Sequence, residues 1–172
     1  MWPHLNKIVA TVLYIDYNGF MDENILEDLV NVPILSELSS DEIKLIAPYW
    51  HYLYLESNEI LFSEGDVADA IYYVLEGEFV IYKDNNGAIP VELTRVKAHQ
   101  FFGEQAVLEE SLRSGTLQAT EASRVLQLTS HDFYEILNKH SYIGVVLLKG
   151  IARYLSLQLR KTTGQYVSIF GE

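Results

Sequence analysis

The order of hydrophobic and polar positions changes twice along the chain and predicts helices on both sides of a central β region. Residues 39–50 open with Ser39 or Ser40, either of which fits a helix N-cap, and apolar residues then recur on one helical face. Residues 52–128 instead alternate apolar and polar positions, with turn residues at short intervals. Many short strands at this spacing predict a mainly β fold of the jelly-roll type, flanked by helices.

Turn residues divide the central region into strands. Residues 76–77, Glu-Gly, separate two β-rich runs, and residues 86–87, Asn-Gly, have the composition of a tight hairpin turn. Further strands are expected around Val91 and Leu93, at residues 115–120 and at residues 123–128.

The last part of the chain is predicted to be helical. Ser130 is a candidate N-cap for a helix with the buried stripe Phe133, Ile136 and Leu137. A long helix is expected from about Tyr142 to Lys161, because basic residues precede Gly164. Its apolar residues cover more than one face, so two interpretations stay open. Either one face packs on the sheet while another meets a partner, or the helix is buried on both sides within one chain.

The N-terminal part is less regular. Residues 21–30 have the pattern of a short amphipathic helix, whereas residues 6–19 fit either helix or strand. The chain therefore divides into an N-terminal helical segment at residues 1–31, a main domain at residues 32–161 and a C-terminal tail at residues 162–172.

Composition and charge limit the classes of function. The 172 residues include 12 Lys and Arg against 24 Asp and Glu, which gives a formal net charge of -12. Such a field repels phosphate backbones, so DNA is not expected as a partner. There are no cysteines, which excludes disulfides and thiolate metal sites. No segment approaches the roughly 20 apolar residues that span a bilayer, so we expect no membrane span and a cytoplasmic location.

One loop, residues 101–116 with the sequence FFGEQAVLEESLRSGT, combines residue types that bind a small anionic ligand. Gly103 permits a positive φ or close backbone approach, and residues 105–108 can form a helical turn whose free N–H groups favour an anion. Arg113 adds a guanidinium fork that matches two phosphate oxygens. Glu104 cannot bind phosphate, but it can accept hydrogen bonds from a sugar hydroxyl. Further contributions are expected from the hydroxyl of Ser114 and from close backbone approach at Gly115.

No catalytic or metal-binding pattern accompanies this loop. The five histidines show no His-x-His or His-Glu spacing for a metal, and there is no Gly-x-Ser-x-Gly, P-loop or cysteine nucleophile. Glu109 and Glu110 are adjacent, so their side chains point apart as on a solvated surface. We therefore expect no enzymatic activity, no metal and no cofactor.

The loop resembles the phosphate-binding cassette of cyclic nucleotide-binding domains, whose pattern is Phe-Gly-Glu, one residue, Ala, then Arg-(Ser/Thr/Ala)-Ala. The interval of nine from glutamate to arginine also matches the family's common length. A second family pattern, Gly-Asp…Asp…Tyr…Gly, lies upstream, and the resemblance covers about Val32 to Lys161. The residues that carry it are Phe102-Gly103-Glu104, Ala106 and Arg113-Ser114-Gly115 in the cassette, and Gly65-Asp66, Asp69, Tyr72 and Gly77 upstream.

The resemblance implies an eight-stranded β-roll with N-terminal helices and a long C-terminal helix. Glu104 would hold the ribose 2′-hydroxyl of cAMP or cGMP, and Arg113 would bind the cyclic phosphate. Backbone amides near Gly103, Ala106 and Ser114 would assist, with Gln105 and Gly115 completing the ligand-binding set. Relatives close a C-terminal helix over the base, which assigns a lid role to Tyr154 and Gln158.

The chain also departs from the family pattern. The family often has a Gly-x-Gly turn before the cassette, but here the stretch is VKAHQ, residues 96–100, without a glycine. Gly115 replaces the usual alanine, which is expected to leave backbone donation intact. Too few residues follow the long helix for the helix-turn-helix of catabolite-activator-type transcription factors, in agreement with the charge argument against DNA.

Together these observations predict a cyclic nucleotide sensor. Binding would move the C-terminal helix and change the surface presented to an unknown downstream protein, and the same helix would support a homodimer. The alternative is a ligand-free β-roll that acts as a constitutive protein-interaction module. In that case Arg113 would form salt bridges with Glu104, Glu109 or Glu110.

Overall fold

The computed structural model describes residues 23–85 and 89–170, which fold into two compact units. The β-roll unit contains residues 48–133, and the helical unit contains residues 23–47 and 134–170. Two predictions, the Asn-Gly turn at residues 86–87 and the ambiguous segment at residues 6–19, lie outside the described residues.

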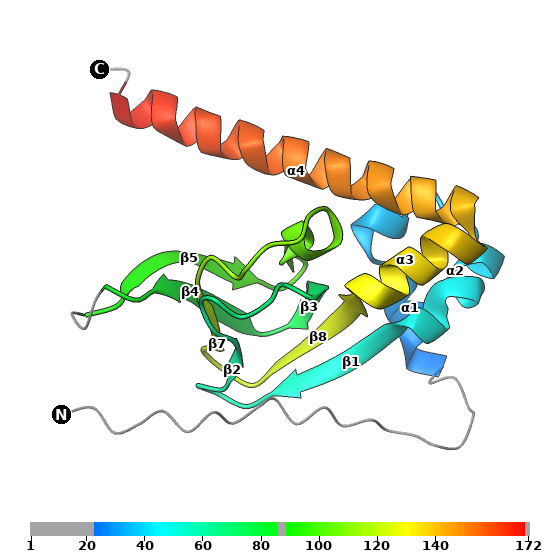
Figure 1. Ribbon diagram of the computed structural model, residues 1–172, viewed down its shortest axis with the longest axis horizontal. Helices are drawn as coiled ribbons and strands as arrows, with labels where there is room; N and C mark the ends of the chain where they lie inside the picture. The colour runs from blue at the N-terminus through cyan, green and yellow to red at the C-terminus, as the bar shows by residue number, and fades with distance from the viewer. Residues whose placement is uncertain (1–22, 86–88, 171–172) are drawn as a thin grey trace. The chain divides into compact units, whose positions relative to one another are not determined.

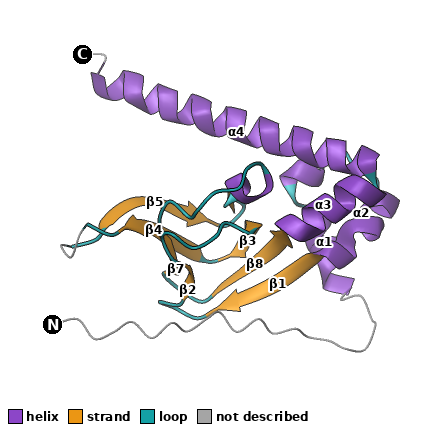
Figure 2. Ribbon diagram, viewed as in Figure 1, coloured by secondary structure: helices purple, strands orange, loops and turns teal. Residues whose placement is uncertain are grey.

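The β-roll unit consists of two antiparallel sheets of four strands each. This confirms the predicted eight-stranded roll. Strands are drawn in orange in Figure 2. The first sheet has the order β1-β8-β3-β6, with β1 Trp50–Leu55, β8 Ser123–Thr129, β3 Ala70–Glu76 and β6 Phe101–Phe102. The second has the order β2-β7-β4-β5, with β2 Ile60–Phe62, β7 Thr116–Ala119, β4 Glu78–Lys83 and β5 Val91–Lys97.

Aromatic side chains dominate the core of the β-roll. The Tyr72 and Phe102 rings stack with centroids 4.9 Å apart, and Phe79 lies 5.7 Å from Phe102. Each ring is almost fully buried, and burial of one such side chain stabilises the fold by about 1.5–3 kcal/mol. Tyr72 and Phe102 belong to the first sheet and Phe79 to the second, so their contact joins the two sheets. Phe102 directly precedes Gly103 of the predicted ligand loop in the sequence.

Gly77 allows the chain to pass from β3 to β4. Its φ is +95°, and a Cβ placed there would lie 2.1 Å from Oγ of Ser123. Only glycine meets both requirements. The predicted division between two strands at this point is confirmed.

Helix α3, Ser130–Lys139, begins with a different cap from the one expected. Thr129 Oγ1 accepts a hydrogen bond from the Asp132 backbone N–H at 3.0 Å, so Thr129, not Ser130, caps the helix. The Ser130 hydroxyl instead donates to the Ala106 carbonyl at 2.7 Å. Either hydroxyl could satisfy a cap, and the sequence alone does not distinguish them.

The helical unit contains α1 Glu23–Val30, the short 3₁₀ turn η1 Pro33–Leu35, α2 Ser40–Ile46 and α4 Ser141–Phe170. Ser39 caps α2, as one of the two predicted alternatives, and forms a reciprocal capping box with Glu42. Helix α2 ends at Ile46, and a second 3₁₀ turn, η2 Ala47–Tyr49, follows directly. Pro48 lies in this turn, and a proline cannot continue an α-helix without loss of a backbone hydrogen bond.

Helix α4 is longer than predicted, because it continues through Gly164 to Phe170. A glycine inside a helix costs about 1 kcal/mol relative to alanine, which weakens a helix without ending it. Residues 162–170 of the expected tail are therefore helical. The interpretation with α4 buried on both sides is wrong, since several of its apolar side chains are exposed: Tyr142, Val145, Leu157 and Leu159.

The segment Ser141–Thr163 of α4 is long and apolar enough to cross a membrane by length and composition, with a mean hydropathy of 1.2, contrary to the sequence expectation. This is weak evidence for a membrane span, because core helices pass the same test. Lys149 and Arg153 lie in the middle of the segment, and both form ion pairs with Glu37. Cations at a bilayer centre cost about 3 kcal/mol each, so packing within the helical unit explains this helix better.

His99 occupies a left-handed backbone conformation in the turn before the predicted cassette, with φ +66°. This is the stretch in which the family often has glycine. The turn is held by the His99 N–H, which donates to the Val74 carbonyl at 2.8 Å, and the ring lies 3.4 Å from the Tyr73 hydroxyl. Histidine tolerates positive φ better than most residues but remains strained there.

We predict that His99→Gly will be more stable than His99→Ala by about 1 kcal/mol, because only alanine retains the cost of the left-handed conformation. Both variants remove the imidazole, so their difference isolates the backbone term. Urea denaturation of the two variants measures it. Equal free energies of unfolding would contradict the backbone explanation.

Candidate functional site

Arg113 is the buried cation of the predicted ligand loop, with 6% of its surface exposed. Its backbone is fixed by the turn at Gly65-Asp66. The Arg113 N–H donates to the Asp66 carbonyl at 2.8 Å, and the Gly65 N–H donates to the Arg113 carbonyl at 2.9 Å. The two sequence patterns that were identified separately therefore form one structural element.

The Arg113 guanidinium has its own set of contacts. Nη2 donates to the Ala70 carbonyl at 3.1 Å and to Oδ1 of Asp69 at 3.3 Å. The guanidinium also lies over the Phe62 ring, 4.2 Å from its centroid, and 5.5 Å from that of Tyr72. Such cation–π contacts stabilise a desolvated charge.

The carboxylate partner of Arg113 is thus Asp69, and the ion pair with Glu104, Glu109 or Glu110 that the alternative required is wrong. The Asp69 side chain is 73% exposed. Solvent screens its charge, so this ion pair contributes little to stability compared with a buried pair. The sequence pattern contains Asp69 but does not reveal its partner, and nothing in the pattern singles out Phe62.

The guanidinium has unused hydrogen-bonding capacity. Nε of Arg113 is buried and has no hydrogen-bond partner within the described residues. Nearly all buried polar groups in folded proteins are paired, and an unpaired one costs about 1–3 kcal/mol. A buried, positively charged donor without an acceptor is the arrangement that a bound anion would complete.

Gly103 lies against this guanidinium. It has φ +74° and precedes a 3₁₀ turn, η3 Glu104–Val107, close to the expected helical turn. A Cβ at position 103 would lie 2.7 Å from Nη1 of Arg113 and 2.9 Å from the Ala70 carbonyl oxygen. The glycine therefore permits both the turn and the close approach of the arginine.

The other predicted ligand residues differ in burial and in their hydrogen bonds. Glu104 is half-buried, and within the part of the chain that the structure describes its carboxylate has no ion pair. The Ala106 N–H, an amide that the resemblance assigns to phosphate, already donates to the Gly103 carbonyl at 3.1 Å. Gln105 and Ser114 are exposed.

Gly115 is buried against strand β4. A Cβ at this position would lie 3.0 Å from the Tyr82 carbonyl oxygen and 3.0 Å from Cγ2 of Ile81. Glycine thus replaces the usual alanine where the neighbouring strand leaves little room.

The Tyr72 ring lies beside the Arg113 guanidinium. Burial raises the pKa of its phenol, which opposes ionisation and keeps the hydroxyl neutral. The Tyr72 hydroxyl accepts a hydrogen bond from Nε2 of Gln127 at 3.4 Å. The side chain of Tyr72 beside Arg113 is therefore aromatic and neutral, and it adds no negative charge to the site.

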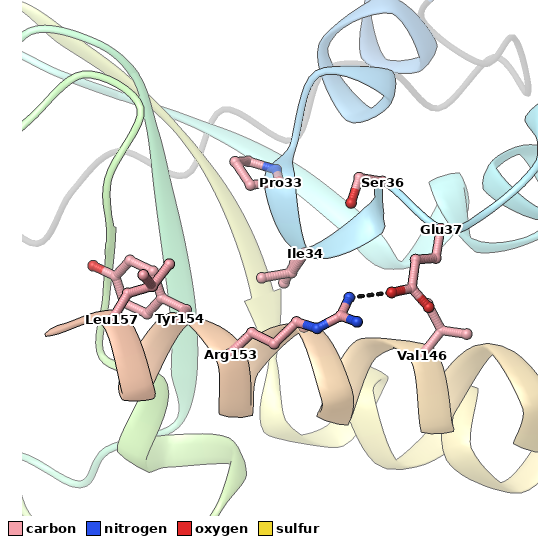
Figure 3. A pocket seen from close by; sticks show the side chains of 9 residues that line it. Pro33, Ile34, Ser36, Glu37, Val146, Arg153, Tyr154 and Leu157 are labelled. Carbon is pink, nitrogen blue, oxygen red and sulfur yellow. Dashed lines mark hydrogen bonds and ion pairs between the residues drawn. The ribbon is translucent and has the colours of Figure 1, made fainter. Parts of the chain in front are cut away.

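The two predicted lid residues, Tyr154 and Gln158, belong to the helical unit and are hydrogen-bonded to each other at 2.6 Å. Their lid role stays a prediction. Tyr154 lines a groove between η1 and α4, and Figure 3 shows the Arg153 guanidinium directed at Glu37 beside it. Hydrogen bonds from Lys149 and Arg153 lower the pKa of the Glu37 carboxyl. The groove is lined by Pro33, Ile34, Ser36, Glu37, Val146, Gly150, Arg153, Tyr154 and Leu157.

We predict that Gly103→Ala will destabilise the protein more than Gly65→Ala. Both glycines have positive φ, which costs an alanine about 1–2 kcal/mol, but a Cβ at Gly65 meets no atom within 4 Å. Urea denaturation should therefore show an additional loss only for Gly103→Ala, because that side chain collides with Arg113 and the Ala70 carbonyl. Equal losses in the two variants would show that the close approach is unimportant.

Known proteins share this architecture. The chain is 24% identical over 123 residues to the cyclic AMP receptor protein of Thermus thermophilus, covering 72% of this chain and 57% of that protein. It is 29% identical over 121 residues to a cAMP-dependent protein kinase regulatory subunit of Schizosaccharomyces pombe, covering 70% and 28%. The chain thus spans about half or less of the length of these relatives.

A solved structure of a cyclic nucleotide-binding domain from Methylobacillus flagellatus has the same fold, with a TM-score of 0.72 at 21% identity, covering 85% of this chain and 82% of that one. The family model described as cyclic nucleotide-binding domain matches residues 52–140, more than half of the chain. The matched residues contain both halves of the site around Arg113. The chain belongs to the cyclic nucleotide-binding domain family.

Proposed function

We propose that the chain is a regulatory module that binds a cyclic nucleotide, cAMP or cGMP, at the cassette around Arg113. The observation that carries the proposal is the buried guanidinium, whose Nε has no hydrogen-bond partner among the residues that the structure describes. Arg113 binds the cyclic phosphate, because a charged fork in a water-poor site favours phosphate oxygens. Glu104 accepts hydrogen bonds from the ribose 2′-hydroxyl, which agrees with its half-buried carboxylate, for which the described part of the chain supplies no ion pair.

The overall negative charge does not oppose this assignment. The net charge of -12 is spread over the whole chain. Salt screens exposed charges that lie more than about 10 Å from the ligand, so most of this charge has little effect at the site. At the site, the guanidinium rests on two aromatic faces and has one exposed carboxylate partner. Local donors therefore determine whether a small anion binds.

We infer that ligand binding changes the position of α4, with Tyr154 and Gln158 covering the base. The separate compactness of the β-roll unit and the helical unit supports this inference, because two units can change position while each keeps its core. Such coupling requires tighter nucleotide binding in one arrangement than in the other. The output then passes to a downstream protein, and we place the module in the cytoplasm.

Calorimetric titration with cAMP and with cGMP tests the proposal. We predict saturable binding of at least one nucleotide, and a loss of about 100-fold or more in Arg113→Ala, because two charge-assisted hydrogen bonds disappear. Arg124→Ala serves as a matched control, since Arg124 forms an ion pair with Glu76 away from the cassette. Circular dichroism checks that each variant is folded.

Absence of binding by either nucleotide at high micromolar concentration would overturn the proposal. It would favour the alternative function, a β-roll that acts as a constitutive protein-interaction module. Unchanged affinity in folded Arg113→Ala would reject the phosphate role of Arg113 while leaving nucleotide binding in place.

We also propose that α4 forms a homodimer with α4 of a second copy. Apolar or small residues recur along it at alternating intervals of three and four, the spacing of a coiled-coil seam. Val145 and Leu159 on this seam are 60% and 68% exposed, whereas Val146, Leu147 and Ile151 off the seam are buried. The seam consists of Val145, Leu148, Ala152, Leu155, Leu159 and Thr162.

Sedimentation equilibrium tests the dimer. We predict that Leu159→Glu weakens self-association by more than tenfold, because it places two carboxylates in the seam. Leu157→Glu is the control, since Leu157 is also exposed but lies off the seam. A wild-type chain that stays monomeric at about 100 μM would contradict the proposal, since that concentration corresponds to a weak association.

A further inference from the structure

A second unpaired polar atom lies close to Arg113 in the sequence. Among the side chains of residues 25–85 and 89–163, three buried nitrogen or oxygen atoms have no hydrogen-bond partner: Nε1 of Trp50, Oγ of Ser111 and Nε of Arg113. Two of the three belong to the cassette, two positions apart. Each such atom lowers the stability of the folded chain by about as much as the loss of a hydrogen bond, unless a ligand supplies the missing partner.

The backbone places the side chains of Ser111 and Arg113 on one face. Residues 111–113 are extended, because Leu112 forms an isolated antiparallel bridge with Val67. The Ala68 N–H donates to the Ser111 carbonyl at 3.0 Å, which fixes the segment before Arg113. Side chains alternate along extended backbone, so positions 111 and 113 share a face, while Leu112 is 61% exposed on the other.

Both unpaired groups are hydrogen-bond donors, since a guanidinium N–H can only donate and a hydroxyl can donate to a charged oxygen. One acceptor-rich group would satisfy both. A phosphate has several acceptor oxygens and accepts short, strong hydrogen bonds from hydroxyl groups. An uncharged ligand would leave the exposed carboxylate of Asp69 as the counter-charge of the buried guanidinium, and solvent screens that carboxylate.

We propose that Ser111 is a further ligand-binding residue, whose hydroxyl donates to an oxygen of the same phosphate that Arg113 binds. The proposal rests on the proposed function and deepens it. Ser111 then determines how the phosphate is oriented relative to Arg113, and the cassette holds the anion from two adjacent side chains of one extended segment.

Ser111→Ala is the principal test. Calorimetric titration with the cyclic nucleotide that the wild type binds should show a loss of about 10- to 100-fold, the effect of one hydrogen bond to a charged group. The ligand-free variant should be as resistant to urea as the wild type or more so, because an unpaired buried oxygen is removed. Ser111→Thr, which keeps the hydroxyl, should retain most of the affinity. Ser57→Ala removes an exposed hydroxyl that bonds to the Thr120 carbonyl, and should bind like the wild type.

The two diastereomers of the cyclic nucleotide phosphorothioate separate direct contact from a positioning effect. Sulfur replaces a different exocyclic oxygen in each, and sulfur is a weak acceptor. If Ser111 contacts one oxygen, Ser111→Ala loses little affinity for the diastereomer with sulfur at that position and the full amount for the other.

Equal losses for both diastereomers would overturn direct contact, and so would wild-type affinity in Ser111→Ala or a marked loss of its ligand-free stability. Each of these results is obtained with a wild type that binds nucleotide, so the proposed function survives them. A wild type that binds neither cAMP nor cGMP overturns both.

Discussion

The burial of one positive charge constrains the whole site. A guanidinium that is 6% exposed needs compensation, since a bare charge in a protein interior costs several kcal/mol. The β-roll supplies a backbone carbonyl from β3, one exposed carboxylate and two aromatic faces. This compensation is incomplete, because Nη2 has two acceptors whereas Nε has none within the described residues. The Gly65-Asp66 turn fixes the backbone of Arg113, and Gly103 allows its guanidinium to lie close to the backbone.

The helical unit is stabilised by different means. Glu37 pairs with two cations one turn apart on α4, so a single carboxylate attaches η1 to the long helix. Gly150 permits this approach, since a Cβ there would lie 2.6 Å from the Ile34 carbonyl oxygen. Ion pairs at the surface are individually weak, so the close backbone contact and the buried residues Val146, Leu147 and Ile151 contribute more. The helical unit therefore has a packed core of its own.

The sequence contains enough information for the strands and the cassette, but not for the connections between them. Alternating apolar residues and the Glu76-Gly77 break identify β3 and β4, because a two-residue period is a local property. The partner of Arg113 is a long-range contact between positions 69 and 113, which no local pattern encodes. Thr129 and Ser130 are equivalent as caps until the position of the Ala106 carbonyl is known. Helix α4 continues to Phe170 and not only to Lys161, because Gly164 weakens a helix without ending it.

His99 has a consequence for how members of this family are recognised. The turn before the cassette requires a residue with positive φ, and here histidine meets that requirement without a glycine. In this chain, therefore, the turn depends on a backbone angle that histidine can adopt, and glycine is not required. A sequence pattern that insists on glycine would discard chains such as this one, although their β-roll is complete. A pattern that also admits histidine, asparagine and aspartate at this position would describe the family by its geometry.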